Sequence, residues 1–336
     1  MADRSGIGGT GGVDGLPAAT WNPLTGYTLI APGRADSAAA VFAERRRGEP
    51  GRLFEQGRDV RRWPERLMPP LRWRTPRRIL LKSRSDIFDD RVEASWLAEI
   101  WATMACTPQH TYQILTARHQ RMRALLGDPC FAAAVRRRAL VTDLCWPLPN
   151  VWLGVSAADQ RWTDVRVPAL AQTPAAVRWL SLEPLLGPVD LHRHLRTGAL
   201  EWIVVAGESG QRARPMHPAW VRTIRDAADV AGVPFYFKQW GTYAPAAVVD
   251  APDFLGGRAF IHPTRGGVEA AIMVEPDTTG NFRTAVTRPM LPGDHGRMGV
   301  MLDRDTIAVR VGKHAAGRLL DGRIHEEYPR LAIAGV

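Results

Sequence analysis

Short apolar runs alternate with helix-like segments through most of this 336-residue chain, and this alternation constrains its fold more than any other feature. The runs have no clean polar–apolar alternation, and each is followed by a polar cluster, which is typical of strands buried on both faces. The predicted strands are Ala18–Asn22, Arg78–Ser83, Thr111–Thr116, Val151–Ser156, Val177–Glu183, Trp202–Glu208 and Pro234–Gln239. The predicted helices between them include Glu93–Ala105, Arg118–Leu126, Gln160–Ala171 and Pro218–Ala231.

Strands that alternate with helices predict an α/β fold with a parallel sheet. Six or seven such units favour a partial or complete parallel (β/α) barrel, related to the TIM barrel. A doubly wound sheet is the alternative, although no glycine-rich dinucleotide fingerprint follows the first strand. We therefore expect a flexible leader at 1–17 and a barrel domain at 18–243. A Gly/Pro-rich extension with a hairpin and a short C-terminal helix is expected at 244–336.

The chain has three cysteines, Cys106, Cys130 and Cys145, whose spacing fits neither a disulfide scaffold nor a zinc site. We expect them to be ordinary buried thiols. No apolar run reaches the length of about 18 residues that a membrane span needs, so no membrane partner is expected. The first residues lack the hydrophobic core of a signal peptide, which favours a cytoplasmic location. The oligomeric state is left open.

The formal net charge of +10 is concentrated in residues 45–91, which hold 15 lysines or arginines against 7 acidic residues. Trp63 and Trp73 lie among these arginines. Arginines beside flat aromatic rings can bind phosphates and stack on bases, so the segment predicts nucleic acid as a partner. The alternative is a solvated arginine-rich surface. The candidate contacts are Arg61, Arg62, Arg72, Arg74, Arg77 and Arg78.

Only three of the 44 basic residues are lysines, and two of them, Lys82 and Lys238, end predicted strands. In a parallel barrel the carboxyl ends of the strands share one edge, where active sites form. Ammonium and carboxylate groups at that edge can transfer protons or hold a zwitterionic ligand. Such residues can also simply mark where strands leave the core. The catalytic candidates are Lys82, Asp86, Glu183, Lys238 and Gln239.

The turn after the Trp202 strand is a candidate ligand-binding segment, formed by Gly207, Glu208 and Ser209. Small residues at a strand end let a ligand approach the backbone, and the carboxylate can accept from an amine or a hydroxyl. A tight turn into the next helix explains the same residues equally well.

Several distinctive blocks follow one another in unbroken order over roughly residues 18–330, among them TWNPLTGYTLIAPGRADS, LKSRSDIFDD, LSLEPLLGPVDL, GESGQRARPMHPAWV and GVPFYFKQWG. Together they resemble the phage-associated three-cysteine-motif family, which is similar to radical S-adenosylmethionine enzymes. The resemblance implies a radical-SAM-like partial barrel. It also implies a [4Fe–4S] cluster held by three cysteines, which binds and cleaves S-adenosylmethionine.

The cluster positions carry other residues here, namely Tyr27, Arg34 and Ser37, although the family's C-x6-C-x2-C spacing survives. Tyrosine and serine are poor ligands for iron–sulfur clusters, and arginine repels the metal. We therefore expect no cluster and no reductive radical chemistry.

The resemblance leaves S-adenosylmethionine, or another small anionic or zwitterionic molecule, as the expected ligand. Whether such a protein is a pseudoenzyme or a new enzyme stays open. A metal-free barrel enzyme with Glu183 and Glu208 as acid and base is a further alternative.

Overall fold

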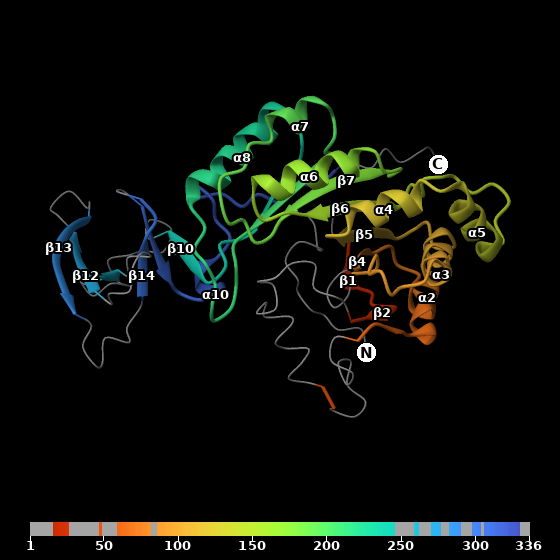
Figure 1. Cartoon of the computed structure of the whole chain (residues 1–336), viewed down its shortest axis with the longest axis horizontal. Coiled ribbons are helices and arrows are strands. Elements are labelled where there is room, and N and C mark those ends of the chain that lie inside the picture. The colour runs from red at the N-terminus through yellow and green to blue at the C-terminus, as the bar shows by residue number, and fades with distance from the viewer. Residues whose placement is uncertain are drawn as a thin grey trace.

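The computed structural model of the chain describes residues 16–26, 47–48, 59–81, 86–245, 259–261, 270–276, 282–289, 298–303 and 306–329. Its largest element is a seven-stranded parallel sheet whose strands neighbour one another in chain order. The sheet curls into a half-barrel with β1 and β9 outermost (Figure 1). Its strands are β1 (Ala18–Thr20), β4 (Arg78–Leu81), β5 (Thr111–Thr116), β6 (Val151–Ser156), β7 (Val177–Leu182), β8 (Trp202–Ala206) and β9 (Phe235–Gln239).

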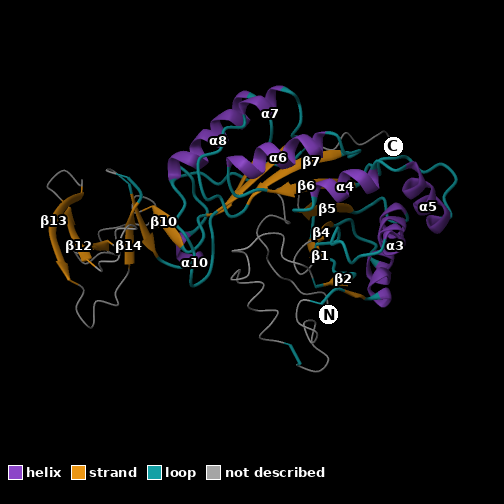
Figure 2. Cartoon of the chain, in the orientation of Figure 1, coloured by secondary structure: helices purple, strands orange, loops and turns teal. Residues whose placement is uncertain are grey.

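Helices cover one side of this sheet, the convex side (Figure 2). They are α3 (Ala94–Ala105), α4 (His119–Leu126), α5 (Pro129–Ala139), α6 (Gln160–Ala171), α7 (His192–Arg196) and α8 (Pro218–Val230). Local signals fix their ends. Helix α6 begins where Asp159 Oδ1 accepts from the Trp162 amide at 3.0 Å, a standard N-cap. Helix α8 ends just before Gly232, whose φ of +64° suits the left-handed residue that closes a helix.

The two faces of the sheet bury different side chains, because neighbouring residues of a strand point to opposite sides. Leu153, Leu180 and Ile203 belong to the main core on the helix side. Trp152 and Trp202 belong to a second, aromatic cluster on the concave side. All six residues of β5 and of β6 are buried, so burial on both faces explains why these strands show no polar–apolar alternation.

The segment 325–328 closes the concave aromatic cluster near the amino ends of the strands. Trp202 Nε1 donates to the Glu327 carbonyl oxygen at 2.9 Å, and the Tyr328 ring lies 5.0 Å from the Trp202 ring. The Phe237 amide donates to the His325 carbonyl oxygen at 3.0 Å, which ties the segment to β9. The end of the described chain therefore completes the half-barrel's core.

Smaller sheets flank the half-barrel. A six-stranded sheet has the order β10-β15-β14-β11-β12-β13, and in it only β11 and β14 run parallel. Its strands are β10 (Tyr243–Pro245), β11 (Ala259–Ile261), β12 (Ala270–Pro276), β13 (Phe282–Pro289), β14 (Met298–Met301) and β15 (Ile307–Arg310), followed by α10 (Lys313–Ala316). Before β4 come β2 (Leu24–Thr25), which pairs with β3 (Arg61–Arg62), then the turn η1 (Pro64–Leu67) and α2 (Met68–Arg72).

The predicted alternation of strands and helices is confirmed, and the partial barrel is the form that the described residues adopt. A doubly wound sheet needs a reversal of strand order, which this sheet does not have.

One expectation is wrong: Cys106, Cys130 and Cys145 are exposed rather than buried. They occupy the cap of α3, the first turn of α5 and the loop after it, where side chains face solvent.

Candidate functional site

An ion pair between two of the predicted residues lies at the carboxyl edge of the sheet, the edge where the strands end. Lys238 Nζ donates to Glu183 Oε1 at 2.6 Å, and the two side chains are 13% and 31% exposed. Glu183 follows β7 and Lys238 belongs to β9, so the pair bridges the end of β8. Such a pair presents a cationic donor and an anionic acceptor side by side, which matches the two charges of a zwitterion.

A β-bulge in β9 sets the position of Lys238. Val205 pairs with Phe237 and Ala206 pairs with Gln239, so Lys238 is the extra residue between two regular pairs. A bulge bends its strand and changes the direction of the extra side chain. The bulge thus accounts for a long cationic side chain at the strand's end being turned toward Glu183.

Polar atoms without a hydrogen-bond partner among the described residues lie on the concave face of the sheet, below this ion pair. Gln113 and Ser181 are each 1% exposed, and Ser181 lies two residues before Glu183, about 7 Å along β7. Buried polar atoms nearly always have a partner in folded proteins, so such a group indicates a place for a polar ligand or for water. The unpaired atoms are Gln113 Nε2, Trp152 Nε1, Trp179 Nε1 and Ser181 Oγ on this face, and Gln239 Oε1 at its carboxyl edge.

The predicted ligand-binding turn packs tightly against the chain after β9. A Cβ atom on Gly207 would lie 1.8 Å from the Trp240 carbonyl oxygen, so only glycine fits this contact. Gly241 has a φ of +91°, and a Cβ there would lie 2.2 Å from the Glu208 carbonyl oxygen. The two glycines let two backbones cross closely, which positions Ser209 within 3.4 Å of Gln239 Nε2.

Glu208 already has a partner. Its Oε2 accepts from the amide and Nε of Arg214 at 2.9 and 2.8 Å, and Oε1 accepts from Arg214 Nη2 at 3.0 Å. Hydrogen bonding to this carboxylate raises the pKa of the Arg214 guanidinium further. A ligand that uses Glu208 would have to share it with Arg214 or displace that arginine.

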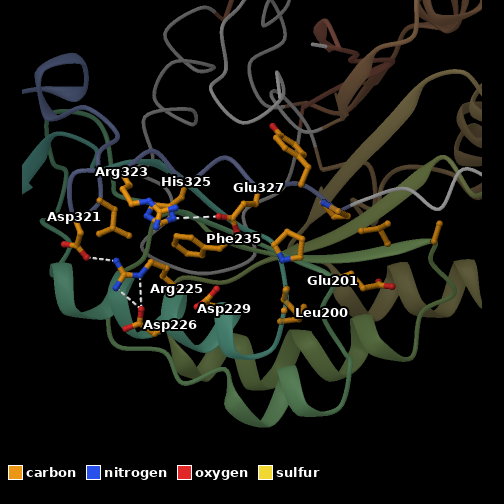
Figure 3. A pocket seen from close by; sticks show the side chains of 18 of the residues that line it. Leu200, Glu201, Arg225, Asp226, Asp229, Phe235, Asp321, Arg323, His325 and Glu327 are labelled. Atoms are coloured by element: carbon orange, nitrogen blue, oxygen red, sulfur yellow. Dashed lines mark hydrogen bonds and ion pairs between the residues drawn. The ribbon is translucent and has the colours of Figure 1, made fainter. Parts of the chain in front are cut away.

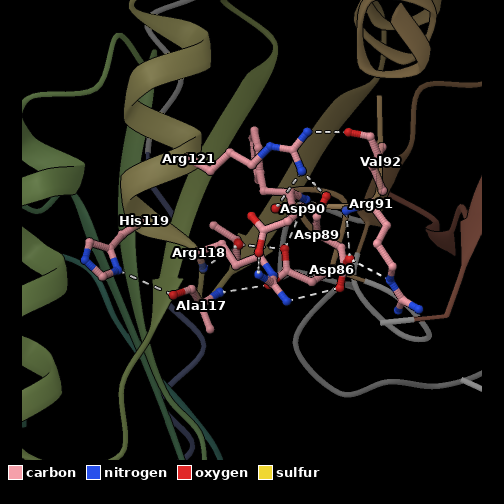
Figure 4. Close-up of polar contacts among 11 residues, drawn as sticks. Asp86, Asp89, Asp90, Arg91, Val92, Ala117, Arg118, His119 and Arg121 are labelled. Carbon is pink, nitrogen blue, oxygen red and sulfur yellow. Dashed lines mark hydrogen bonds and ion pairs between the residues drawn. The ribbon is translucent and has the colours of Figure 1, made fainter. Parts of the chain in front are cut away.

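Asp86 joins the loop after β4 to the end of β5 (Figure 4). Its Oδ1 accepts from Thr116 Oγ1 at 2.6 Å and from the Phe88 amide at 3.1 Å, while Oδ2 accepts from the Ala117 amide at 3.1 Å. Both oxygens therefore organise the carboxyl edge. These contacts place Asp86 in a supporting position, and its catalytic role stays a prediction.

A buried charge network beside Asp86 locks the same loop onto α4 (Figure 4). Asp89 is 0% exposed and accepts from Arg118 Nη2 at 3.1 Å and from Arg91 Nε at 3.2 Å. Arg118 also pairs with Asp90, and Arg121 donates to the carbonyl oxygens of Asp89 and Val92. The residues at the carboxyl edge of β4 and β5 are therefore held by charge-assisted hydrogen bonds.

The candidate arginines lie elsewhere. Arg72 and Arg74 are exposed in and after α2, and Arg77 lies over the Trp73 ring at 5.0 Å. These residues come just before β4, so they lie at the amino edge of the sheet, opposite the Lys238–Glu183 pair. Arg78 is only 5% exposed and lies over the Tyr328 ring at 3.7 Å, which places it in the interior and not on the proposed surface.

Trp63 is not a free stacking platform. Both Arg61 and Arg66 lie over its ring at 4.1 Å, and its Nε1 donates to Thr25 Oγ1 at 2.8 Å. Arg62 pairs with Glu99 of α3. These arginines hold the β2–β3 pair and η1 together, so Arg72, Arg74 and Arg77 are the better candidates for contacts with phosphate.

The predicted residues Lys82, Tyr27, Arg34 and Ser37 lie outside the described residues. Within the described ranges, no group of three or more His, Cys, Asp or Glu side chains is placed to hold a metal ion. The donor chemistry of tyrosine, arginine and serine does not fit an iron–sulfur cluster. No helix in the described part of the chain is long and apolar enough to cross a membrane.

Sequence reasoning missed the polar residues of the concave face. Gln113 and Ser181 lie inside apolar runs that predict buried strands, and a polar residue at such a position is itself a signal. Trp152 and Trp179 gave no comparable signal, because a tryptophan in a strand usually packs in the core. Their unpaired Nε1 atoms become visible only once the face is assembled.

Residues 16–329 match the model of the family described as "Protein of unknown function (DUF5131)". The match includes the half-barrel, the Lys238–Glu183 pair and the strands that follow Gly241. No curated protein and no solved structure matches the chain.

Proposed function

We propose that this chain, which belongs to the DUF5131 family, binds a small zwitterionic ligand such as S-adenosylmethionine at the carboxyl edge of its half-barrel, without reductive radical chemistry. The observation that carries the proposal is the Lys238–Glu183 ion pair, which lies above a concave face with unpaired polar atoms.

The chemistry of this edge complements a zwitterion. Lys238 offers a cation to a carboxylate, Glu183 offers an anion to an ammonium group, and both are partly buried, which strengthens their interactions. Below them, Gln113 Nε2 and two tryptophan Nε1 atoms are donors that have no partner in the part of the chain that the structure describes. Heteroaromatic nitrogens or carbonyl oxygens of a ligand would satisfy such donors.

The resemblance of the sequence blocks to a phage-associated, radical-SAM-like family supports S-adenosylmethionine as the ligand. The substitutions at Tyr27, Arg34 and Ser37 support the loss of reductive cleavage, because three thiolates are needed to hold the cluster that donates the electron. The proposed protein therefore binds the ligand of such enzymes and lacks their radical chemistry.

Calorimetric titration with S-adenosylmethionine tests the proposal. Lys238→Met should weaken binding by about 10-fold or more, since a charge-assisted hydrogen bond contributes roughly 1.5–3 kcal/mol. Lys313→Met is the matched control, because it removes the same charge from an exposed lysine in α10 that does not belong to the Lys238–Glu183 pair. Both variants should keep the thermal unfolding midpoint of the wild type to within about 4 °C.

No binding by the wild type, or equal affinity of Lys238→Met and wild type, would refute the ligand site. Anaerobic reconstitution with iron and sulfide tests the other half of the proposal. Bound iron near the four atoms per chain of a [4Fe–4S] cluster would show that the chain does hold one.

Nucleic-acid binding is the second candidate function, and the exposed Arg72 and Arg74 at the amino edge favour it. Fluorescence anisotropy with a labelled single strand at several salt concentrations tests it. Affinity should fall steeply with salt, and Arg72→Glu with Arg74→Glu should reduce the slope of log K against log salt by about 1 for each residue. Arg136→Glu with Arg137→Glu, on the exposed side of α5, is the charge-matched control. Salt-independent binding would contradict this function.

A further inference from the structure

A groove of about 1020 Å³ lies at the amino edge of the sheet, away from the Lys238–Glu183 pair (Figure 3). It runs between the last turns of α8 and the segment 320–329, across the residues that precede or begin β7, β8 and β9. Leu200, Val233 and Phe235 contribute apolar lining. Neither the proposed ligand site nor the arginine surface uses this groove.

Acidic groups dominate its polar lining. Glu201, Asp226, Asp229, Asp321 and Glu327 contribute five carboxylates, whereas Arg225 and Arg323 contribute two cations. Arg225 pairs with Asp226 and Asp321, and Arg178 pairs with Glu201. Among the described residues, Asp229 and Glu327 are the lining carboxylates that pair with no arginine or lysine, so these two leave negative charge at the groove in a chain whose formal net charge is +10.

Asp229 differs from the other carboxylates of the groove in its unfavourable position on a helix. It lies in the last turn of α8, where the free carbonyl groups and the helix dipole disfavour a negative charge. Its carboxylate has no ion-pair partner among the residues that the structure describes, and the side chain is exposed to the groove. An acidic residue that works against helix stability is explained if it serves a ligand.

His325 adds an acceptor on the opposite wall. It is 6% exposed, its ring packs edge-on against Phe235, and its Nε2 has no hydrogen-bond partner among the described residues. Burial lowers the pKa of this imidazole, so the ring is neutral near pH 7. Its Nδ1 lies 3.9 Å from Glu327 Oε1, and one nitrogen of the neutral ring can accept a hydrogen bond.

We propose that the amino-edge groove binds a small organic cation with ammonium groups on an aliphatic body, the chemistry of a linear polyamine. Carboxylates and a neutral imidazole accept from ammonium groups, and the apolar lining packs against methylene groups. The net positive charge of the protein repels a cation at long range, so a cation must be attracted by a local site such as the groove.

Calorimetric titration with spermidine at low salt is the test, with Asp229→Asn as the variant. We expect binding by the wild type and a loss of about 3- to 5-fold in affinity for Asp229→Asn. Asp143→Asn removes the same charge from an exposed loop outside the groove, and its affinity should stay within about 2-fold of wild type. Because the dipole disfavours Asp229, Asp229→Asn should keep or raise the thermal unfolding midpoint while it weakens binding.

Absence of spermidine binding would overturn the proposal, as would equal losses in Asp229→Asn and Asp143→Asn. An arginine-rich peptide is a second titrant for the same variants. If the peptide binds in an Asp229-dependent manner and spermidine does not, the groove docks a protein and the small-cation proposal is wrong.

Discussion

At the scale of single residues, two glycines control the geometry of the candidate site. Replacing Gly207 by alanine puts a Cβ 1.8 Å from the Trp240 carbonyl oxygen. Replacing Gly241 by alanine puts a Cβ 2.2 Å from the Glu208 carbonyl oxygen, and it also forces alanine into a backbone conformation with a φ of +91°. Either change forces the crossing backbones apart, and each should cost about 2–4 kcal/mol in free energy of unfolding. Gly187→Ala is the control, because no atom lies within 4 Å of the position that its Cβ would take. Urea unfolding measures all three, and a Gly207→Ala variant as stable as Gly187→Ala would contradict the close approach.

Two neighbouring aspartates contact the same arginine from different environments. Asp89 is 0% exposed, whereas the side chain of Asp90 is 74% exposed, and both pair with Arg118. Asp89→Asn removes one partner of a buried network and should cost about 3–5 kcal/mol. Asp90→Asn should cost less than about 1 kcal/mol, because solvent screens an exposed pair. Chemical unfolding of the two variants tests this difference. Equal losses in free energy of unfolding would show that the buried network stabilises the fold no more than the exposed pair does.

Sequence reasoning reached some of these residues and missed others for physical reasons. Glu183 and Lys238 could be predicted because they end apolar runs, and the structure brings them together at 2.6 Å. The bulge that positions Lys238 could not be predicted from the sequence, because it depends on the pairing of β9 with β8. Asp86 was found as a polar residue after a strand, yet its hydrogen bonds come from Thr116 and Ala117 at the end of the neighbouring strand β5, which no local pattern identifies.

At the scale of elements, Asp321 joins the segment after α10 to α8. Arg222 and Arg225 both bind its carboxylate, and hydrogen bonding to Arg222 is the main reason that the pKa of Asp321 falls to about 2. A carboxyl group with a lowered pKa in the folded state stabilises the fold above about pH 4, and this stabilisation is lost as pH falls toward 2. Since the pair is partly exposed, we expect about 1 kcal/mol or less. Asp321→Asn should therefore be less stable than wild type at pH 6, with a gap that narrows by pH 3 in urea unfolding. A gap independent of pH would rule out this ion pair as its source.

The segment 325–328 acts as a structural element although it is neither helix nor strand. Tyr328 packs against Trp202 at 5.0 Å and against Tyr236 at 5.5 Å, so it covers the aromatic cluster of the concave face. Tyr328→Ala should cost about 3 kcal/mol through lost packing. Ile324→Ala changes a side chain that is 53% exposed and should stay within about 0.5 kcal/mol. Thermal unfolding compares them, and similar midpoints would mean that the segment does not close the core.

The regular elements were the most predictable part of the fold. The runs that predict β5 and β6 have the bounds that the structure shows, and α6 begins and ends as predicted. Helix α5 was not predicted, because its alanines and arginines form a weak apolar stripe. The covering of the concave face by residues 325–328 could not be predicted, since it joins positions far apart in the chain.

At the scale of the whole molecule, the half-barrel separates two kinds of surface. The carboxyl edge carries the Lys238–Glu183 pair, while the amino edge carries Arg72 and Arg74 near β4 and the acidic groove near β7 to β9. Strands of five or six residues place these edges roughly 17–20 Å apart. Since the Debye length at physiological salt is about 8 Å, charges at one edge are screened from the other.

Sites at opposite edges should therefore be energetically independent. Arg72→Glu with Arg74→Glu should leave the affinity for S-adenosylmethionine within about 2-fold of wild type, and Lys238→Met should leave nucleic-acid affinity equally unchanged. The triple variant combines all three substitutions. For each ligand, its loss of binding free energy should equal the sum of the losses in the separate variants, since effects of distant residues without shared partners add to within about 0.5 kcal/mol. Titrations of the four proteins with each ligand complete the cycle. Coupling beyond about 1 kcal/mol would mean that the two ligands compete for one site, and the division of function between the two edges would then be wrong.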